Sequence, residues 1–177
     1  MSIGRSATAV VVPVPAAEPV VSAWRERFDA SAAEGMPAHI TALYPFLDAE
    51  RLDDDVLAAL RELCTQRPVL DVAFRQVGRF PGVLYLDPEP ADDIRRLTLA
   101  IAERWPEAPP YGGSFEDFVP HLTVARGAGD DVMADIETDV LRGLPLHTRV
   151  SEASLWVFDG ARWRRRARLP FSLGVAR

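Results

Sequence analysis

Two histidines of this chain, His39 and His121, stand in the same short pattern, in which threonine is the second residue after the histidine. In a strand, side chains two positions apart share one face, so each histidine should point the same way as its threonine, Thr41 or Thr123. Histidine exchanges protons near neutral pH, and a threonine hydroxyl can donate a hydrogen bond to a phosphate oxygen. Two such pairs facing each other predict acid–base chemistry on a phosphodiester, without metal or covalent intermediate.

A single His-x-Thr pattern is typical of an ordinary strand. Here the pattern occurs twice and contains two of the three histidines of the chain. The third, His147, has no threonine two residues later and is expected to be structural or exposed. A metal site would need more ligands than the histidines and the lone Cys64 supply. Carboxylates could complete one, so a metal-dependent hydrolase remains an alternative. Cys64 is expected to be a small core residue of a helix.

The elements that position the two motifs occur in the same order in both halves. Hydrophobic periodicity and turn residues predict, in the first half, a strand, a helix, the motif strand, a second helix and an extended segment: 9–14, 17–29, 39–43, 53–65 and 69–80. The second half repeats this order and ends in a hairpin: 83–86, 91–105, 121–125, 130–141, 146–158 and 163–171. Asp159-Gly160 is the hairpin signal.

We therefore interpret residues 1–177 as a single bilobal domain with an internal repeat of approximately 6–82 and 83–171. The predicted class is α+β, with two mainly antiparallel sheets and flanking helices around a central cleft. The loop 106–120 breaks the symmetry and is rich in proline, glycine and aromatic residues, Phe115 among them. Such a loop is either functional, which makes Phe115 a candidate substrate contact, or a surface excursion.

The composition excludes several chemistries. The chain has no lysine and no asparagine, so its 20 cationic side chains are all arginine, a bias that suggests a GC-rich bacterial genome. Without lysine there is no P-loop, no Schiff base and no lysyl-adenylate. The net charge of −6 argues against binding along duplex nucleic acid. With no signal-peptide or membrane-spanning pattern and a single cysteine, we expect a cytoplasmic monomer without a cofactor.

The segments "PAHITALYPF" (37–46) and "FVPHLTVAR" (118–126) resemble the paired signatures of the two-histidine phosphoesterase superfamily, nearest to its bacterial 2′-5′ RNA ligase and cyclic phosphodiesterase branch. The resemblance covers nearly the whole chain. It implies a bilobal fold, metal-independent hydrolysis of 2′,3′-cyclic phosphates on RNA or nucleotides, and reversible 2′,5′ linkage chemistry. It also implies that His39 is the general acid and His121 the base, and that both threonines bind the phosphate.

Further candidates follow the two motifs. Arg126 matches an arginine common in the family and could neutralise a phosphate, but strict alternation points it away from His121, so it needs a bulge or a long reach. Tyr44 and Phe46 either stack on a nucleobase or pack in the core. The arginines of 162–168 are expected to guard an edge strand, with RNA contact as the alternative. A further alternative for the whole chain is a non-catalytic module that binds nucleotides or RNA ends.

Overall fold

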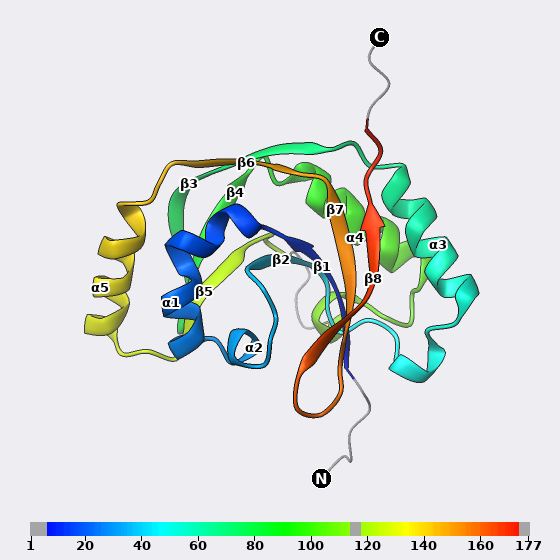
Figure 1. Ribbon diagram of the computed structural model, residues 1–177, viewed down its shortest axis with the longest axis horizontal. Helices are drawn as coiled ribbons and strands as arrows, with labels where there is room; N and C mark the ends of the chain where they lie inside the picture. The colour runs from blue at the N-terminus through cyan, green and yellow to red at the C-terminus, as the bar shows by residue number, and fades with distance from the viewer. Residues whose placement is uncertain (1–6, 114–117, 174–177) are drawn as a thin grey trace.

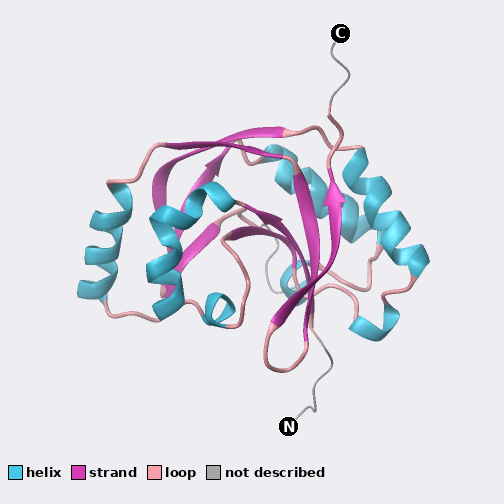
Figure 2. Cartoon of the chain, in the orientation of Figure 1, coloured by secondary structure: helices cyan, strands magenta, loops and turns pink. Residues whose placement is uncertain are grey.

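The computed structural model describes residues 7–113 and 118–173, and within them eight strands form one curled sheet (Figures 1 and 2). The strands are β1 (Thr8–Pro13), β2 (His39–Leu43), β3 (Leu70–Phe80), β4 (Val83–Glu89), β5 (Leu122–Arg126), β6 (Leu146–Val150), β7 (Glu152–Phe158) and β8 (Trp163–Pro170). The α-helices are α1 (Glu18–Phe28), α2 (Ala30–Ala33), α3 (Asp54–Thr65), α4 (Asp92–Arg104) and α5 (Asp130–Leu141), and the 3₁₀ turns are η1 (Pro15–Ala17), η2 (Ala49–Arg51) and η3 (Pro110–Gly113). The strand order is β6-β3-β4-β5-β2-β1-β7-β8, with antiparallel neighbours throughout. The predicted α+β class is confirmed.

The two His-x-Thr strands form the centre of this sheet. β2 pairs with β5 at Ile40 and Leu122, and this bridge joins the two expected sheets into one. Strands of each half cross to the other half's side of the sheet. β3 of the first half pairs with β4 of the second half, and β7 of the second half pairs with β1 of the first. Each side of the sheet is therefore built from both halves of the sequence.

The segment predicted as one strand over 146–158 is two strands, which corrects the sequence interpretation. β6 ends at Val150 and pairs with β3 at one edge of the sheet, whereas β7 begins at Glu152 and pairs with β1 on the other side. Their burial differs accordingly. β6 alternates between exposed and half-buried residues as an edge strand does, whereas β7 buries the consecutive run Ala153, Ser154 and Leu155. The hydrophobic pattern alone does not show that the chain crosses the molecule between them.

The helices cover the sheet in two groups, α1 with α5 at one end and α3 with α4 at the other (Figure 1). α1 packs on β5 and α4 packs on β2, so each helix contacts the motif strand of the other half. α4 turns Ile94, Leu97 and Ile101 into the core, where full burial of one such side chain contributes roughly 1.5–3 kcal/mol. Thr98 on the same face donates a hydrogen bond to the carbonyl of Ala42 in β2. Among the described residues, no helix combines the length and the apolar character that crossing a membrane requires.

Candidate active site

The two His-x-Thr motifs meet across the central pair of strands. In the antiparallel register set by Ile40 and Leu122, each histidine lies across from the threonine of the other motif, on strands about 5 Å apart. Ile40 and Leu122 are fully buried, and the motif side chains leave the sheet on its other face. The pairing therefore brings together the four residues of the two motifs: His39, Thr41, His121 and Thr123.

Both histidine rings are oriented by the carbonyl two residues earlier. Nδ1 of His39 lies 2.7 Å from the carbonyl oxygen of Pro37. Nδ1 of His121 lies at the same 2.7 Å from the carbonyl oxygen of Val119. A carbonyl oxygen can only accept a hydrogen bond, so Nδ1 carries the proton in both rings. Nε2 is then the nitrogen that can exchange a proton with a substrate.

Burial disfavours the charged form of both rings. Desolvation lowers the pKa of His39 from 6.5 to about 4; the Pro37 hydrogen bond opposes the shift, and the charges of Arg25 and His121 add to it. Desolvation also lowers the pKa of His121, against the effect of the Val119 hydrogen bond. The two rings thus lie within electrostatic reach of each other, and both are neutral at pH 7 in the free protein.

A bulge follows the threonine in each motif and redirects the residues beyond it. Ala42 is left out of the pairing of β2 with β1, and Val124 is left out of the pairing of β5 with β4. Beyond the second bulge, Arg126 pairs with Val83, and its Nη2 donates to Oγ1 of Thr123 at 3.3 Å. The bulge is the physical reason why Arg126 reaches the face of the histidines, which strict alternation would not allow.

The aromatic candidates after the first motif have different surroundings. Tyr44 is 39% exposed, and its ring meets that of Trp163 edge-on, with centroids 6.3 Å apart. Phe46 is buried and packs edge-to-face on Trp105 at 5.1 Å. Tyr44 is thus accessible to a ligand, whereas Phe46 takes the second of its two expected roles and packs in the core. The third aromatic candidate, Phe115, lies outside the described residues.

Aromatic rings form a wall beside His121. Phe80 stacks on Tyr85 with centroids 4.4 Å apart, and these rings meet His121 edge-on at 5.1 and 5.4 Å, respectively. The ring of Tyr85 lies over the backbone of Gly78, where a Cβ atom would come within 2.2 Å of it. Glycine at this position therefore makes room for the ring that packs against His121.

A cavity of about 480 Å³ adjoins the wall, within the usual range of small-ligand sites. Its lining is mainly apolar and aromatic, with one histidine and one arginine: Phe80, Pro81, Val83, Tyr111, Phe118, Val119, His121 and Arg126. Tyr111 belongs to η3 and has a left-handed backbone (φ 51°), and its N–H donates to the carbonyl of Tyr44 at 2.7 Å. The residue that follows β2 thus holds Tyr111 of the loop 106–120 beside the cavity.

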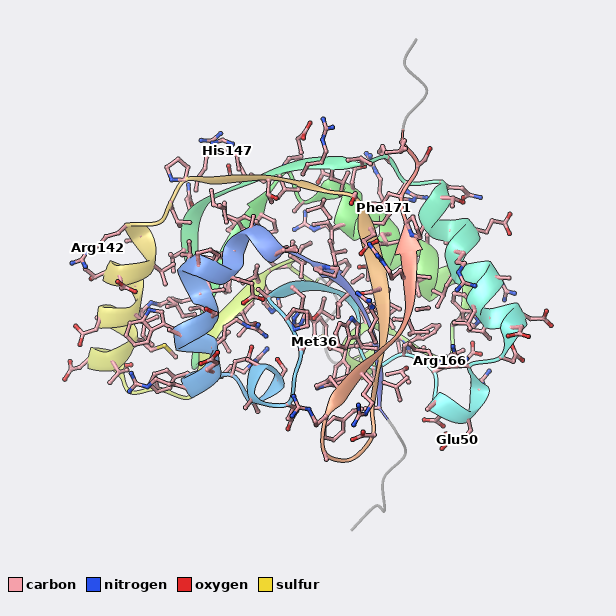
Figure 3. The ribbon with its side chains drawn as sticks, in the orientation of Figure 1. Met36, Glu50, Arg142, His147, Arg166 and Phe171 are labelled. Carbon is pink, nitrogen blue, oxygen red and sulfur yellow. The ribbon has the colours of Figure 1, made fainter. Side chains whose placement is uncertain are left out.

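A larger cavity, of about 570 Å³, lies between β3, β4 and β6, and most of its lining residues are polar or charged. His147 belongs to it and stands at the outer edge of the molecule, away from Met36 near the middle (Figure 3). This cavity contains no residue of the two motifs. Over residues 7–113 and 118–173, no three histidine, cysteine, aspartate or glutamate side chains gather as a metal site would require.

The sequence profile of the 2′-5′ RNA ligase superfamily matches residues 12–162, a stretch that contains both motifs. The chain belongs to this superfamily. The resemblance to two-histidine phosphoesterases is thereby confirmed, and membership in this superfamily supports a phosphoesterase function.

Bacterial relatives of this superfamily member are named as candidate phosphoesterases. One from Bacillus pumilus is 28% identical over 130 residues, which cover 72% of this chain and 73% of the relative. Another, from Staphylococcus saprophyticus, is 27% identical over 157 residues, covering 84% of this chain and 88% of the relative.

Solved structures of similar fold include Escherichia coli LigT complexed with 3′-AMP, with a TM-score of 0.64 at 19% identity over 94% of this chain and 98% of LigT. The protein TT0787 of Thermus thermophilus gives a TM-score of 0.62 at 19% identity over 96% of this chain and all of that protein (100%). LigT has also been solved with ATP and with NADP⁺. At these identities the likeness shows the shared fold.

Phe80 and Tyr85, the aromatic residues beside His121, were not predicted as site residues from the sequence. From the sequence, Phe80 and Tyr85 are only strand aromatics, which usually pack in a core. A signal was present in Gly78, because glycine inside a strand often marks a close approach of another group. The loop aromatics Tyr111 and Phe118 were visible in the sequence, but only the fold places them in the cavity beside His121.

The arginine-rich strand is β8, at the edge of the sheet, as expected. Arg164 pairs with Asp159 at 2.7 Å and Arg168 with Glu152 at 2.9 Å, and the arginine side chains of both pairs are mostly exposed. These contacts agree with a solvated, charged edge. RNA contact by this strand remains a prediction.

We expect Arg126→Gln to lower kcat/KM on a phosphodiester substrate by about 10- to 100-fold, because a charge-assisted hydrogen bond is worth about 1.5–3 kcal/mol. Steady-state kinetics with the wild type alongside checks this. Arg142→Gln is the matched control, since Arg142 stands at the far end of α5 (Figure 3) and its replacement removes the same charge. Equal kinetics for the two variants would show that Arg126 does not contact the substrate.

Proposed function

We propose that this chain hydrolyses 2′,3′-cyclic phosphates on nucleotides or RNA ends, through acid–base catalysis by His39 and His121 and without a metal ion. The observation that carries the proposal is the antiparallel pairing of the two His-x-Thr strands at the centre of the sheet. It offers one phosphate two imidazoles and two hydroxyls. Thr41 and Thr123 would donate to the non-bridging oxygens, whose charge rises in the transition state.

In this mechanism one neutral imidazole takes a proton from water as the water oxygen attacks phosphorus. The bond from phosphorus to one ribose oxygen breaks, and the other histidine, as imidazolium, gives its proton to that oxygen. The product is a phosphate monoester beside a free ribose hydroxyl. Attack by the 5′-hydroxyl of another RNA end in place of water, with the bond from phosphorus to the 3′ oxygen breaking and that oxygen taking the proton, would form a 2′,5′ linkage.

The family resemblance assigns the acid to His39 and the base to His121, although the near-symmetry of the site lets a substrate exchange these roles. With a pKa of about 4, His39 holds little proton at neutral pH in the free protein. A bound phosphodiester anion would raise the pKa of either ring, because a nearby negative charge favours imidazolium. The substrate would thereby help to charge the acid.

The cavity beside His121 supports a nucleoside as the group that carries the phosphate. Phe80, Tyr111 and Phe118 offer aromatic surface for stacking on a nucleobase, which is worth about 1–3 kcal/mol per base. Arg126 lies at the same cavity and bonds to Thr123, so it can neutralise a phosphate held by that hydroxyl.

The proposal is tested by incubating the protein with the four nucleoside 2′,3′-cyclic monophosphates, and then with oligonucleotides ending in a cyclic phosphate, in excess EDTA. We expect hydrolysis to a monophosphate at an undiminished rate in the chelator. Activity that disappears in EDTA and returns with a divalent cation would favour a metal-dependent hydrolase. Binding without turnover would instead indicate a module that recognises nucleotides or RNA ends.

The lowered histidine pKa values predict an acidic optimum. Catalysis requires one histidine protonated and the other neutral, so kcat/KM should peak between their two pKa values, both below 6.5. Above the higher pKa the acid loses its proton, and kcat/KM should fall about tenfold per pH unit. Rates on a cyclic mononucleotide between pH 4 and 9 check this, and a maximum above pH 7 would contradict it.

A further inference from the structure

We infer that two side chains of α1, Glu18 and Arg25, position His39 for catalysis. They hold the backbone segment 36–38, which contains the carbonyl that orients the His39 ring. The catalytic consequence rests on the proposed function, whereas the claim about the ring can be measured without any activity.

Glu18 fixes the segment at the residue next to His39. The backbone N–H of Ala38 donates to Oε1 of Glu18 at 2.6 Å. The carbonyl of the same residue accepts from the N–H of Val14 at 2.9 Å. Both backbone groups of Ala38 are thus held from outside the motif, and the peptide that enters β2 has little freedom to tilt.

Arg25 fixes the segment at its other end. This arginine is only 2% exposed, and its Nε lies 3.3 Å from Oδ2 of the buried Asp29. Its Nη2 donates to the carbonyl of Met36 at 3.2 Å and lies 3.4 Å from Oγ of Ser31. A buried arginine is tolerated only where its charge is paired and its N–H groups are bonded, so this carbonyl is part of what keeps Arg25 in place.

Between these two anchors lies Pro37, whose carbonyl accepts the hydrogen bond from Nδ1 of His39. The hydrogen bond at one ring nitrogen decides which nitrogen carries the proton. If the segment relaxed and this carbonyl moved, Nδ1 would lose its acceptor, and the tautomer with the proton on Nε2 would become populated. That tautomer cannot accept a proton at Nε2.

α1 also packs on β5, the strand that carries Thr123 and follows directly from His121. One rigid helix therefore contacts the second motif strand and grips the segment that enters the first. This arrangement fixes His39 relative to the other half of the site, in addition to the single bridge between β2 and β5.

The ring itself provides the first test. The chain has three histidines, so a long-range ¹H–¹⁵N spectrum at pH 7 resolves their ring signals. Spectra of His121→Ala and His147→Ala assign these signals. We expect His39 in the Nδ1–H tautomer in the wild type and in a mixture in Glu18→Ala. Glu18→Gln should restore the wild-type spectrum because its amide oxygen accepts the same bond. Glu26→Ala, an exposed site on the same helix, should change nothing.

Kinetics provide the second test. Glu18→Ala should lower kcat on a cyclic phosphate by about tenfold with KM within about twofold, since the ring is misplaced but the binding groups remain. Glu18→Gln should recover most of the rate. An unchanged His39 tautomer in Glu18→Ala, or a Gln variant as impaired as the Ala variant, would overturn the inference. Lack of turnover by the wild type would overturn only the proposed function, since the spectrum still decides the position of the ring.

Arg25→Lys supplies an independent variant at the other anchor. Lysine keeps the charge beside Asp29 but lacks the fork that reaches Met36 at the same time. We expect the same shift toward a mixed His39 tautomer, with thermal unfolding confirming that the variant is folded. If Arg25→Lys were folded and gave the wild-type spectrum, Arg25 would not position the His39 ring, and this part of the inference would be wrong.

Discussion

Replacing either His39 or His121 by alanine is expected to lower kcat on a 2′,3′-cyclic phosphate by at least about a hundredfold, because each variant lacks one of the two proton-transfer groups. The two losses should not add. Once one partner is missing, the other can no longer act in a concerted transfer, so the double variant should be about as slow as the slower single variant. Single-turnover rates with excess enzyme measure the chemical step directly.

His147→Ala is the control for both variants, because it removes the third histidine from an exposed position at the cavity between β3, β4 and β6. It should retain the wild-type rate. If His39→Ala or His121→Ala also kept near-normal turnover, the paired-histidine mechanism would be wrong. Circular dichroism and thermal unfolding of each variant separate a lost proton transfer from a lost fold.

The local elements of the fold could be predicted because short-range patterns determine them. α5 has the predicted bounds, 130–141, and α3 begins one residue after its predicted start because Asp53 caps it, accepting from the N–H of Val56 at 2.9 Å. The first motif strand, β2, also has the predicted bounds, 39–43. The hydrophobic periodicity, capping residues and prolines that set the bounds of a helix or strand all lie within a few positions of it. Its bounds can therefore be predicted from the local sequence.

The long-range arrangement could not be predicted in the same way. The exchange of β3 and β7 between the two sides depends on pairings with β4 and β1, and no local pattern records these. The bulge at Val124 is a relation between two strands, and it alone determines that Arg126 reaches the site. Tyr44 and Phe46 have similar local sequences, and only the position of Trp105 shows which one is buried.

The close approach of Tyr85 to Gly78 gives the second large prediction. Gly78→Ala should lower the free energy of unfolding by about 1–3 kcal/mol, the usual cost of overpacking, because its Cβ would lie 2.2 Å from Cζ of Tyr85. For a chain of this length, each kcal/mol of lost unfolding free energy lowers Tm by about 2–4 °C. We also expect kcat to fall about tenfold, since the displaced ring no longer packs against His121.

Gly129→Ala is the matched control, because nothing lies within 4 Å of its added Cβ and its backbone φ of −65° suits alanine. Gly129 is the N-cap of α5, where alanine is less favourable than glycine, so its unfolding free energy should fall by less than about 1 kcal/mol. If Gly78→Ala behaved in the same way, the ring of Tyr85 would be free to move aside and would not support His121.

Combining Gly78→Ala with Tyr85→Ala separates the two roles that glycine can have in β3. If the cost comes from contact with the ring, removing the ring should abolish it, and Gly78→Ala should be nearly neutral in a Tyr85→Ala background. If glycine were needed for the backbone of the strand, its replacement would cost the same in both backgrounds. Tyr85→Ala should by itself lower kcat, because His121 loses one of its two edge-on neighbours and keeps only Phe80. A stability coupling together with a similar kcat in both single variants would show that Gly78 acts on the site through Tyr85.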